Sequence, residues 1–398
     1  MPPHHDSFAP LDPGRRFLMG PGPSDMHPRV YQAMGAPLTG HLDPYFIGVM
    51  DDTKALLRYV FQTENAMTLA ISATGSAGME TCICNLVEPG DEVLICVGGV
   101  FGDRMAQMAK RHGGRLVRLD GEPGRPFTPE QVRQALDGCR PKVVGLVHAE
   151  TSTGVLQPLE EIIPVIHEHG ALVLVDTVAS LGGTPVEVDA WGIDVCYTGS
   201  QKCLSAPPGL APLTLNGRAL EVIAARKTPV DSWYMDLSLI NAYWDGDRTY
   251  HHTAPVSLFY ALREALVLIH EEGLENGHRR HAANYEAFRA GIDAMGLAFF
   301  VDPPHRAPTI NPVLAPEGID EAGVRSRLLK DYGLELGGGL GALKGKAWRV
   351  GLMGQSSQRD HVILCLGALE HALRAEGHEV AGSGVAAASA VYADAGTA

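Results

Sequence analysis

The feature of this sequence that points most clearly to chemistry is a lysine, Lys202, in a polar loop between two apolar segments. Residues 193–197 and 211–215 are both apolar enough to be buried strands, so the loop between them holds Lys202 near the protein core. The alternative is a solvated surface lysine, which is the usual place for this residue type. However, the Gly-Ser pair at 199–200 allows a close backbone approach, and Pro-Pro-Gly at 207–209 stiffens the end of the loop. Such a setting is typical of a lysine that forms a Schiff base.

An aspartate, Asp176, ends another apolar segment, residues 171–175. In an open parallel sheet, ligands bind at the carboxyl ends of the strands. Lys202, the Glu-Thr pair at 150–151 and the Thr-Gly-Ser stretch at 74–76 also follow predicted strands, so we expect all of them to gather at one edge of a sheet. Alternatively, Asp176 caps a following helix.

A loop of small residues, Ala-Thr-Gly-Ser-Ala-Gly at 73–78, lies between a predicted strand and a helical pattern at 79–87. Free backbone N–H groups and the helix dipole both point at such a loop, which makes it a candidate anion site. The alternative is that small residues are present only for close packing. We therefore interpret Thr74, Gly75 and Ser76 as a candidate phosphate cradle.

These features together match what a pyridoxal phosphate site needs. The lysine forms an imine with the cofactor aldehyde, and a carboxylate such as Asp176 keeps the pyridine nitrogen protonated. The loop would hold the phosphate, and an aromatic side chain, Phe101, would stack on the ring. The sequence has no Gly-x-x-x-x-Gly-Lys-Ser/Thr, Gly-x-Ser-x-Gly or His-Glu-x-x-His motif, so other chemistries fit less well.

The elements that must position these residues alternate between strand and helix patterns. Segments such as 143–147 and 171–175 are apolar throughout, which is typical of parallel strands covered by helices on both faces. Pro164 interrupts one predicted helix, which must either begin late or be kinked. The helices predicted in this half of the chain lie at residues 43–61, 79–87, 103–112, 129–136 and 159–169.

The pattern changes after residue 253, where two long helices precede a mixture of short strands and helices. We therefore predict an α/β protein with a large domain built on a mostly parallel sheet and a smaller C-terminal α+β domain. The Ala/Gly/Ser-rich end of the chain is predicted to be a flexible tail. The predicted division is an N-terminal arm at 1–22, the large domain at 23–255, the small domain at 256–380 and the tail at 381–398.

Composition excludes several classes of protein. The 398 residues are 45% hydrophobic with a net charge of -14, which argues against binding to nucleic acid or to an anionic membrane. The seven cysteines are odd in number, and Cys82-Ile83-Cys84 lacks the spacing of a metal or redox pair, so no metal is expected. With neither a secretory signal pattern nor an apolar run of roughly 18 residues, we expect a soluble, cytoplasmic protein.

Long motifs in consistent order resemble class V aminotransferases of fold type I, in particular the alanine–glyoxylate / serine–pyruvate aminotransferase family. The similarity extends over about residues 17–378. The fold, the cofactor and the reaction of that family are therefore expected here. The matching stretches are residues 20–24, 60–63, 86–91, 150–159, 175–185, 199–202, 250–253 and 349–354.

The resemblance implies a role for each matching residue. Lys202 would hold pyridoxal phosphate and move the proton between the substrate and the cofactor, and Asp176 would pair with the pyridinium nitrogen. Arg349 would bind the substrate carboxylate in a bidentate pair, with Gly22 beside it; without the family match, a surface ion pair would be the simpler interpretation of Arg349. The other implied cofactor contacts are Thr151 near the ring oxygen, Val178 beneath the ring, Gly75, Ser76 and Gln201 on the phosphate, and Tyr250 and Thr253 from the second subunit of a homodimer.

The chain departs from the mammalian members of the family at the cofactor site. They carry tryptophan where this chain has Phe101, and a Gly-His pair where it has Gly75 and Ser76. We therefore expect looser stacking and phosphate contacts, with the chemistry retained.

The expected reaction is a ping-pong transamination through a Lys202 Schiff base, from a small L-amino acid (alanine or serine) to a 2-oxo acid (glyoxylate or pyruvate). One alternative is the same fold with ureidoglycine, an aminophosphonate or pyridoxamine as donor. A lyase of the cysteine desulfurase type needs a cysteine on a mobile loop, whereas Cys365 lies in an apolar helical run. A further alternative is a binding protein that has kept the fold without catalysis.

Overall fold

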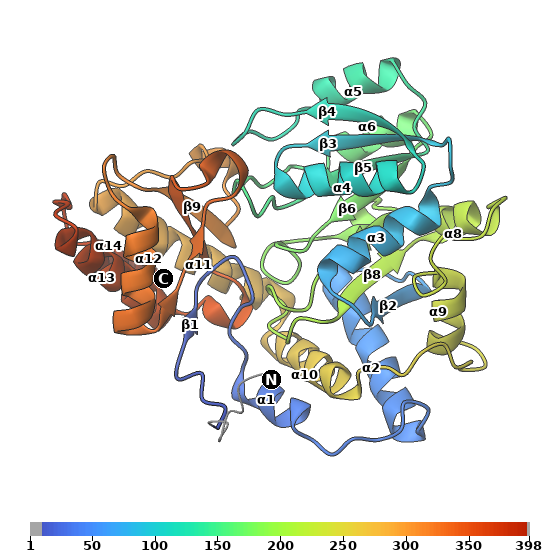
Figure 1. Cartoon of the computed structure of the whole chain (residues 1–398), viewed down its shortest axis with the longest axis horizontal. Coiled ribbons are helices and arrows are strands. Elements are labelled where there is room, and N and C mark those ends of the chain that lie inside the picture. Colours follow the sequence, from blue (N-terminus) through green and yellow to red (C-terminus); the bar gives the residue numbers. More distant parts are fainter. Residues whose placement is uncertain (1–9, 396–398) are drawn as a thin grey trace, which may run out of the picture.

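The large domain is built on one seven-stranded sheet with the strand order β2-β8-β7-β6-β5-β3-β4. In the computed structural model, which describes residues 10–395, β3 to β7 run parallel, while β8 is antiparallel to both β7 and β2. Helices cover this sheet (Figure 1), which confirms the predicted fold class. The strands are β2 (Met67–Ile71), β3 (Glu92–Val97), β4 (Arg115–Asp120), β5 (Val143–Val147), β6 (Leu172–Asp176), β7 (Val195–Tyr197) and β8 (Ala211–Leu215).

Local sequence signals explain where the helices of this domain begin. Asp43 caps α2 by accepting a 2.8 Å hydrogen bond from the backbone N–H of Tyr45. Helix α6 begins at residue 162, which places Pro164 in its first turn, where proline is tolerated. The helices are α1 (Pro28–Met34), α2 (Pro44–Phe61), α3 (Gly75–Leu86), α4 (Val100–Arg111), α5 (Pro129–Asp137), α6 (Ile162–Glu168), α7 (Val188–Trp191), α8 (Gly217–Ala224), α9 (Leu237–Trp244) and α10 (Val256–Glu272).

Helix α3 begins earlier than its periodicity predicts, at Gly75 rather than near residue 79. Its small residues have a packing role as well. A Cβ at Gly78 would lie 2.8 Å from the Cβ of Ala211 on β8, so only glycine lets the helix approach the sheet this closely. Gly75 and Ser76 therefore belong to the first turn of a helix rather than to a loop before it.

A second apolar core supports the smaller C-terminal part of the chain. Its sheet has the order β11-β12-β9, and the short strand β1 pairs with β10. Figure 1 shows the orange and red elements of this part on one side, with blue β1 next to them. Its elements are β1 (Phe17–Leu18), α11 (Leu274–Ala294), β9 (Ile310–Leu314), α12 (Glu321–Tyr332), β10 (Leu334–Glu335), β11 (Gly337–Gly338), β12 (Ala347–Gly351), α13 (Arg359–Ala375), α14 (Gly384–Ala395) and the short 3-10 helices Pro303–His305, Gly341–Leu343 and Gly354–Ser356.

The domain boundary predicted between residues 255 and 256 does not agree with how α10 packs. Helix α10 belongs to the core of the large domain, where Phe259 packs against Phe46 with ring centroids 5.7 Å apart. The predicted arm at 1–22 differs too, because β1 adds a strand to the smaller part and Met19 is buried in its core. The first nine residues of that arm lie outside the described residues.

The prediction of a flexible tail at 381–398 is wrong for most of that segment. Residues 384–395 form α14, which packs on α11. Tyr392 Oη donates a 2.7 Å hydrogen bond to Asn284 Oδ1, and Ala388 is fully buried. Low complexity suggested disorder, but alanine is the strongest helix former and its small side chain permits close helix packing. Residues 396–398 lie outside the described part.

Within residues 10–395, no helix combines the length and the apolar character needed to cross a lipid bilayer.

Candidate active site

Lys202 lies in the loop between β7 and β8 and is only 8% exposed. Its Nζ donates a hydrogen bond to the carbonyl oxygen of Pro21, and its own carbonyl oxygen accepts a 2.7 Å bond from Ser24 Oγ. Burial, and then the positive charge of Arg349, lower the pKa of Lys202 to about 8. About one tenth of this amine is therefore neutral at pH 7, far more than for a lysine with an ordinary pKa, which suits a nucleophile.

Gly22 lies directly against this amine. It has a φ of 103°, and a Cβ there would lie 2.5 Å from Cδ and 2.8 Å from Nζ of Lys202. Only glycine combines this backbone conformation with this close approach. The structure thus brings the sequence-predicted Gly22 to the side of the lysine.

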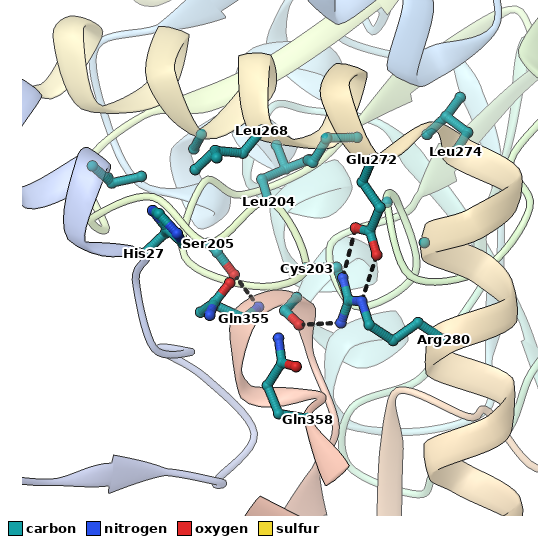
Figure 2. Close-up of a pocket in the computed structure, with 16 residues that line it drawn as sticks. His27, Cys203, Leu204, Ser205, Leu268, Glu272, Leu274, Arg280, Gln355 and Gln358 are labelled. Atoms are coloured by element: carbon teal, nitrogen blue, oxygen red, sulfur yellow. Dashed lines mark hydrogen bonds and ion pairs between the residues drawn. The ribbon is translucent and has the colours of Figure 1, made fainter. Parts of the chain in front are cut away.

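The part of the loop that follows Lys202 contacts the smaller C-terminal part of the chain. Ser205 has a φ of 53°, and its Oγ accepts a 2.7 Å hydrogen bond from the backbone N–H of Gln355 (Figure 2). Both residues line a cavity of about 330 Å³. At another part of this cavity, Arg280 forms an ion pair with Glu272 and donates to the carbonyl oxygen of Gly354. These contacts tie the position of Lys202 to both cores of the protein.

Asp176 is the last residue of β6 and is 3% exposed. Its Oδ2 accepts a 2.6 Å hydrogen bond from Tyr197 Oη, and its Oδ1 accepts a 2.8 Å bond from the backbone N–H of Val178. Burial raises the pKa of Asp176 to about 6, although both hydrogen bonds oppose the rise. Asp176 precedes a turn, not a helix, so the alternative of a helix cap does not apply.

The first turn of α3 borders the same site. Its N-cap, Thr74, makes no side-chain capping hydrogen bond. A Cβ at Gly75 would lie 3.5 Å from the Cα of Gly199 and 3.6 Å from Cγ2 of Val178, so this turn lies in van der Waals range of the lysine loop and of Val178. The buried Oε1 of Gln201 has no hydrogen-bond partner among residues 10–395. A helix N-terminus without a side-chain cap fits an anionic group such as a phosphate, whereas Gln201 could donate to that group only through its Nε2.

Glu150 fixes the start of the helix that carries Phe101. Its carboxylate accepts bonds of 3.3 Å from the backbone N–H groups of both Phe101 and Gly102, and one of 2.5 Å from Ser152 Oγ. The carboxylate thus caps the start of α4, where negative charge is favourable. It holds Phe101 in the first turn of that helix.

Arg349 extends from β12 and is 7% exposed. Its Nε donates a 2.8 Å hydrogen bond to the carbonyl oxygen of Gly338, and its Nη1 donates a 3.3 Å bond to that of Thr151. Burial lowers the pKa of Arg349 to about 10. Arg349 forms no ion pair with any residue in the described part of the chain, so the alternative of a surface ion pair fails. A buried guanidinium without a counter-ion suits an anionic ligand.

Tyr250 and Thr253 are not buried in the site of their own chain. Both are exposed, Tyr250 by 56%, and their hydroxyl oxygens lie 3.5 Å apart. The neighbouring histidines have packing roles instead: His251 stacks on Trp233 with ring centroids 4.5 Å apart, and His252 Nε2 lies 2.6 Å from Ser72 Oγ. A contribution of Tyr250 and Thr253 across an interface stays a prediction.

Two side chains at this site, Tyr197 and Arg104, carry little signal in the sequence pattern. Tyr197 ends an apolar strand and therefore reads as core. Arg104 follows Phe101 by three residues, so the helical period places both on one face of α4, and its Nη1 donates a 2.8 Å hydrogen bond to Ser76 Oγ. This three-residue spacing is the sequence signal that could have predicted Arg104 beside Phe101.

Comparison with known proteins identifies the family. Residues 19–344 match the family model described as aminotransferase class-V. The chain is 42% identical to an alanine–glyoxylate aminotransferase of Callithrix jacchus, over 92% of this chain and 90% of the relative. It is 40% identical to an (S)-ureidoglycine–glyoxylate transaminase of Bacillus subtilis over 96% of each chain.

Solved structures agree with this assignment. The crystal structure of an alanine–glyoxylate aminotransferase from Nostoc sp. is 49% identical, with a TM-score of 0.91 and coverage of 92% of this chain and 98% of that one. A pyridoxamine–pyruvate aminotransferase from Mesorhizobium loti is 30% identical, with a TM-score of 0.90 and coverage of 95% and 97%. The chain therefore belongs to the class V aminotransferase family and is a pyridoxal-phosphate-dependent enzyme.

Proposed function

We propose that this enzyme transfers the amino group of a small L-amino acid, alanine or serine, to a 2-oxo acid, glyoxylate or pyruvate. The observation that carries this proposal is that Lys202, Asp176 and Arg349 are all buried and that the charges of Asp176 and Arg349 both act on Lys202, while Arg349 forms no ion pair among the described residues. Relatives more than 40% identical that bear the name alanine–glyoxylate aminotransferase support the choice of substrates.

The residues of this site fit pyridoxal phosphate. Lys202 would bond to its aldehyde carbon and Asp176 would pair with its ring nitrogen. When bound, the cofactor supplies an electron-withdrawing ring that stabilises negative charge at the substrate α-carbon. The remaining contacts that we propose are Thr74, Gly75, Ser76 and Gln201 for the phosphate, Phe101 and Val178 for the two ring faces, and Thr151 for the ring oxygen.

Two basic side chains would act on the substrate. Arg349 presents a planar guanidinium that can bind the substrate carboxylate through two parallel hydrogen bonds. Lys202, with its lowered pKa, would take the proton from the substrate α-carbon and return it later in the cycle. Gly22 would leave space beside Lys202, because any larger residue would collide with that side chain.

The proposed functional unit is a homodimer. In it, Tyr250 and Thr253 of one subunit would contact the phosphate of the cofactor bound to the other subunit. The exposure of Tyr250, and of Trp233 at 63%, supports a covered surface here. A dimer mass in light scattering is expected, and a monomer that is fully active would contradict this part. We also propose a cytoplasmic location, which the seven free cysteines of the described chain support.

The lyase alternative has little support. Cys365 is fully buried in α13, and burial raises its pKa to about 12, so it is neither mobile nor reactive. Transamination with ureidoglycine as donor is the second candidate, because a relative named for that reaction matches nearly the whole chain.

A donor panel distinguishes these candidates. Alanine, serine, ureidoglycine, an aminophosphonate and pyridoxamine would each be assayed with glyoxylate and with pyruvate, and formation of the oxo product would be measured. We expect the highest kcat/KM for alanine or serine. Arg349→Lys should raise KM for carboxylate donors, since lysine cannot form the bidentate pair. Turnover confined to ureidoglycine, or KM unchanged in Arg349→Lys, would contradict the proposal.

A further inference from the structure

We propose that Arg104 is the cation of the phosphate subsite and acts, together with Ser76 at the start of α3, on the phosphate ester of the cofactor. This inference rests on the proposed function of the site, since it adds a residue to the set that would hold pyridoxal phosphate. None of the residues implied by the family resemblance supplies a positive charge at that end of the cofactor.

The side chain of Arg104 is held at the border of the site by two neighbours. Its Nη1 donates a 2.8 Å hydrogen bond to Ser76 Oγ in the first turn of α3. Its Cζ lies 4.8 Å from the ring centroid of Phe101, so the guanidinium also stacks on the aromatic residue that borders the site. Arg104 is half-buried, and these two contacts fix where its charge lies.

The charge of Arg104 has no counter-ion in the described chain. It forms no ion pair among residues 10–395, although the whole sequence carries a net charge of -14. The nearby carboxylates are already engaged: Asp103 pairs with Arg118, and Glu150 accepts from the start of α4. Asp103 and Glu150 therefore do not neutralise Arg104.

A cation at this place is unfavourable unless an anion joins it. The N-terminus of a helix carries partial positive charge, and the guanidinium of Arg104 adds a full charge next to it. A bound phosphate would convert two repelling groups into two ligands of the same anion.

The donors around this point match a phosphate better than a carboxylate. Arg104, the hydroxyl of Ser76 and the backbone N–H groups of the first turn of α3 are all hydrogen-bond donors, and Arg104 is joined to that turn through Ser76. Gln201 has a buried Oε1 without a partner, and rotating its amide by half a turn would present Nε2 there as a further donor. A tetrahedral phosphate has enough oxygen atoms to accept from all of these groups.

Comparing the binding of pyridoxal phosphate with that of pyridoxal, which lacks the phosphate, isolates the contribution of Arg104 to phosphate binding. The apoenzymes of wild type, Arg104→Gln, Arg104→Lys and the control Lys110→Gln would be titrated with each ligand, and the near-visible absorption of the bound ligand would give Kd. Lys110 is an exposed residue on the same helix, so its substitution makes the same change in net charge. Thermal unfolding of each apoenzyme would confirm that the variants fold.

We expect Arg104→Gln to raise Kd for pyridoxal phosphate on the order of 10-fold or more, as for loss of a charge-assisted hydrogen bond. The Kd of Arg104→Gln for pyridoxal should change little. The Kd of Arg104→Lys for pyridoxal phosphate should lie between those of wild type and Arg104→Gln. Lys110→Gln should match wild type for both ligands. Equal losses for both ligands would show that Arg104 only orients Phe101 and would overturn the inference, as would a wild-type Kd for pyridoxal phosphate in Arg104→Gln. If wild type forms the band with neither ligand, the proposed function itself fails.

Discussion

The phenol oxygen of Tyr197 lies 2.6 Å from Oδ2 of Asp176, and it donates a hydrogen bond to a carboxylate that is almost entirely buried. Strands β6 and β7 are parallel neighbours, and their register sets Asp176 directly beside Tyr197. The sheet itself therefore orients the carboxylate that we assign to the cofactor ring nitrogen. Tyr197 is a positioning residue in this account, because it acts through Asp176.

Replacing Tyr197 with phenylalanine tests this relationship. The pKa of Asp176 should rise further once the hydrogen bond is lost, which weakens its pairing with a protonated ring nitrogen. A hydrogen bond to a charged group contributes about 1.5–3 kcal/mol, so we expect the alanine half-reaction to slow roughly 10-fold or more at saturating cofactor. Tyr392→Phe removes a hydroxyl from the distant helix α14 and should leave this rate unchanged. A wild-type rate in Tyr197→Phe would refute the role.

The stability of the apoenzyme should depend on pH through Asp176. Its pKa is about 6 in the folded protein and 3.8 in its ordinary state, so the folded protein binds this proton more tightly than the unfolded chain. The resulting stability is fully present below pH 3.8 and is lost as pH rises to about 6, with a total of roughly 3 kcal/mol. The Tm of wild-type apoenzyme should fall relative to that of Asp176→Asn over this interval. Parallel Tm curves would contradict the assignment.

Cofactor uptake should report the lowered pKa of Lys202. Only the neutral amine attacks an aldehyde, so the rate at which apoenzyme acquires its near-visible absorption should rise with pH through about 8. Arg349 is the second cause of the lowered pKa, after burial. In Arg349→Gln the midpoint of this rise should therefore move to higher pH, and an unchanged or lower midpoint would be inconsistent with the geometry.

Gly22 should tolerate no side chain. Alanine at this position would meet Lys202 at 2.5 Å and would also strain a φ of 103°. Since a displacement of about 1 Å at a reacting group can cost on the order of 100-fold, we expect Gly22→Ala to lower kcat/KM by about that factor. Gly217→Ala is a suitable control, because a Cβ there meets nothing within 4 Å. Similar kcat/KM values for the two variants would exclude the proposed crowding.

The sequence was sufficient to predict the sheet and the gathering of the main groups. Continuous apolar strands indicated a parallel sheet, and the carboxyl ends of parallel strands meet at one edge. Asp176, Lys202 and the stretch at 74–76 therefore had to lie near one another. Arg349 was different, since only the family resemblance linked a residue of the second core to this edge.

Other features depend on packing that no local pattern encodes. Nothing in the period of α10 shows which core it joins, and the alanine-rich composition of α14 is compatible with a loose tail until α11 offers it a surface. The partner of Tyr197 depends on the register of β6 and β7, and the direction of Arg104 depends on how α4 meets α3. Such contacts between distant segments are fixed only by the tertiary structure.

The most direct test of the central claim is a pair of half-reactions with wild type and Lys202→Ala. Holoenzyme mixed with alanine in the absence of an oxo acid should release pyruvate and lose its near-visible absorption, and glyoxylate added afterwards should restore the absorption and yield glycine. Lys202→Ala should show no catalytic turnover in either direction. Complete half-reactions at wild-type rates in Lys202→Ala, or no response of the wild-type spectrum to any amino donor, would contradict the account.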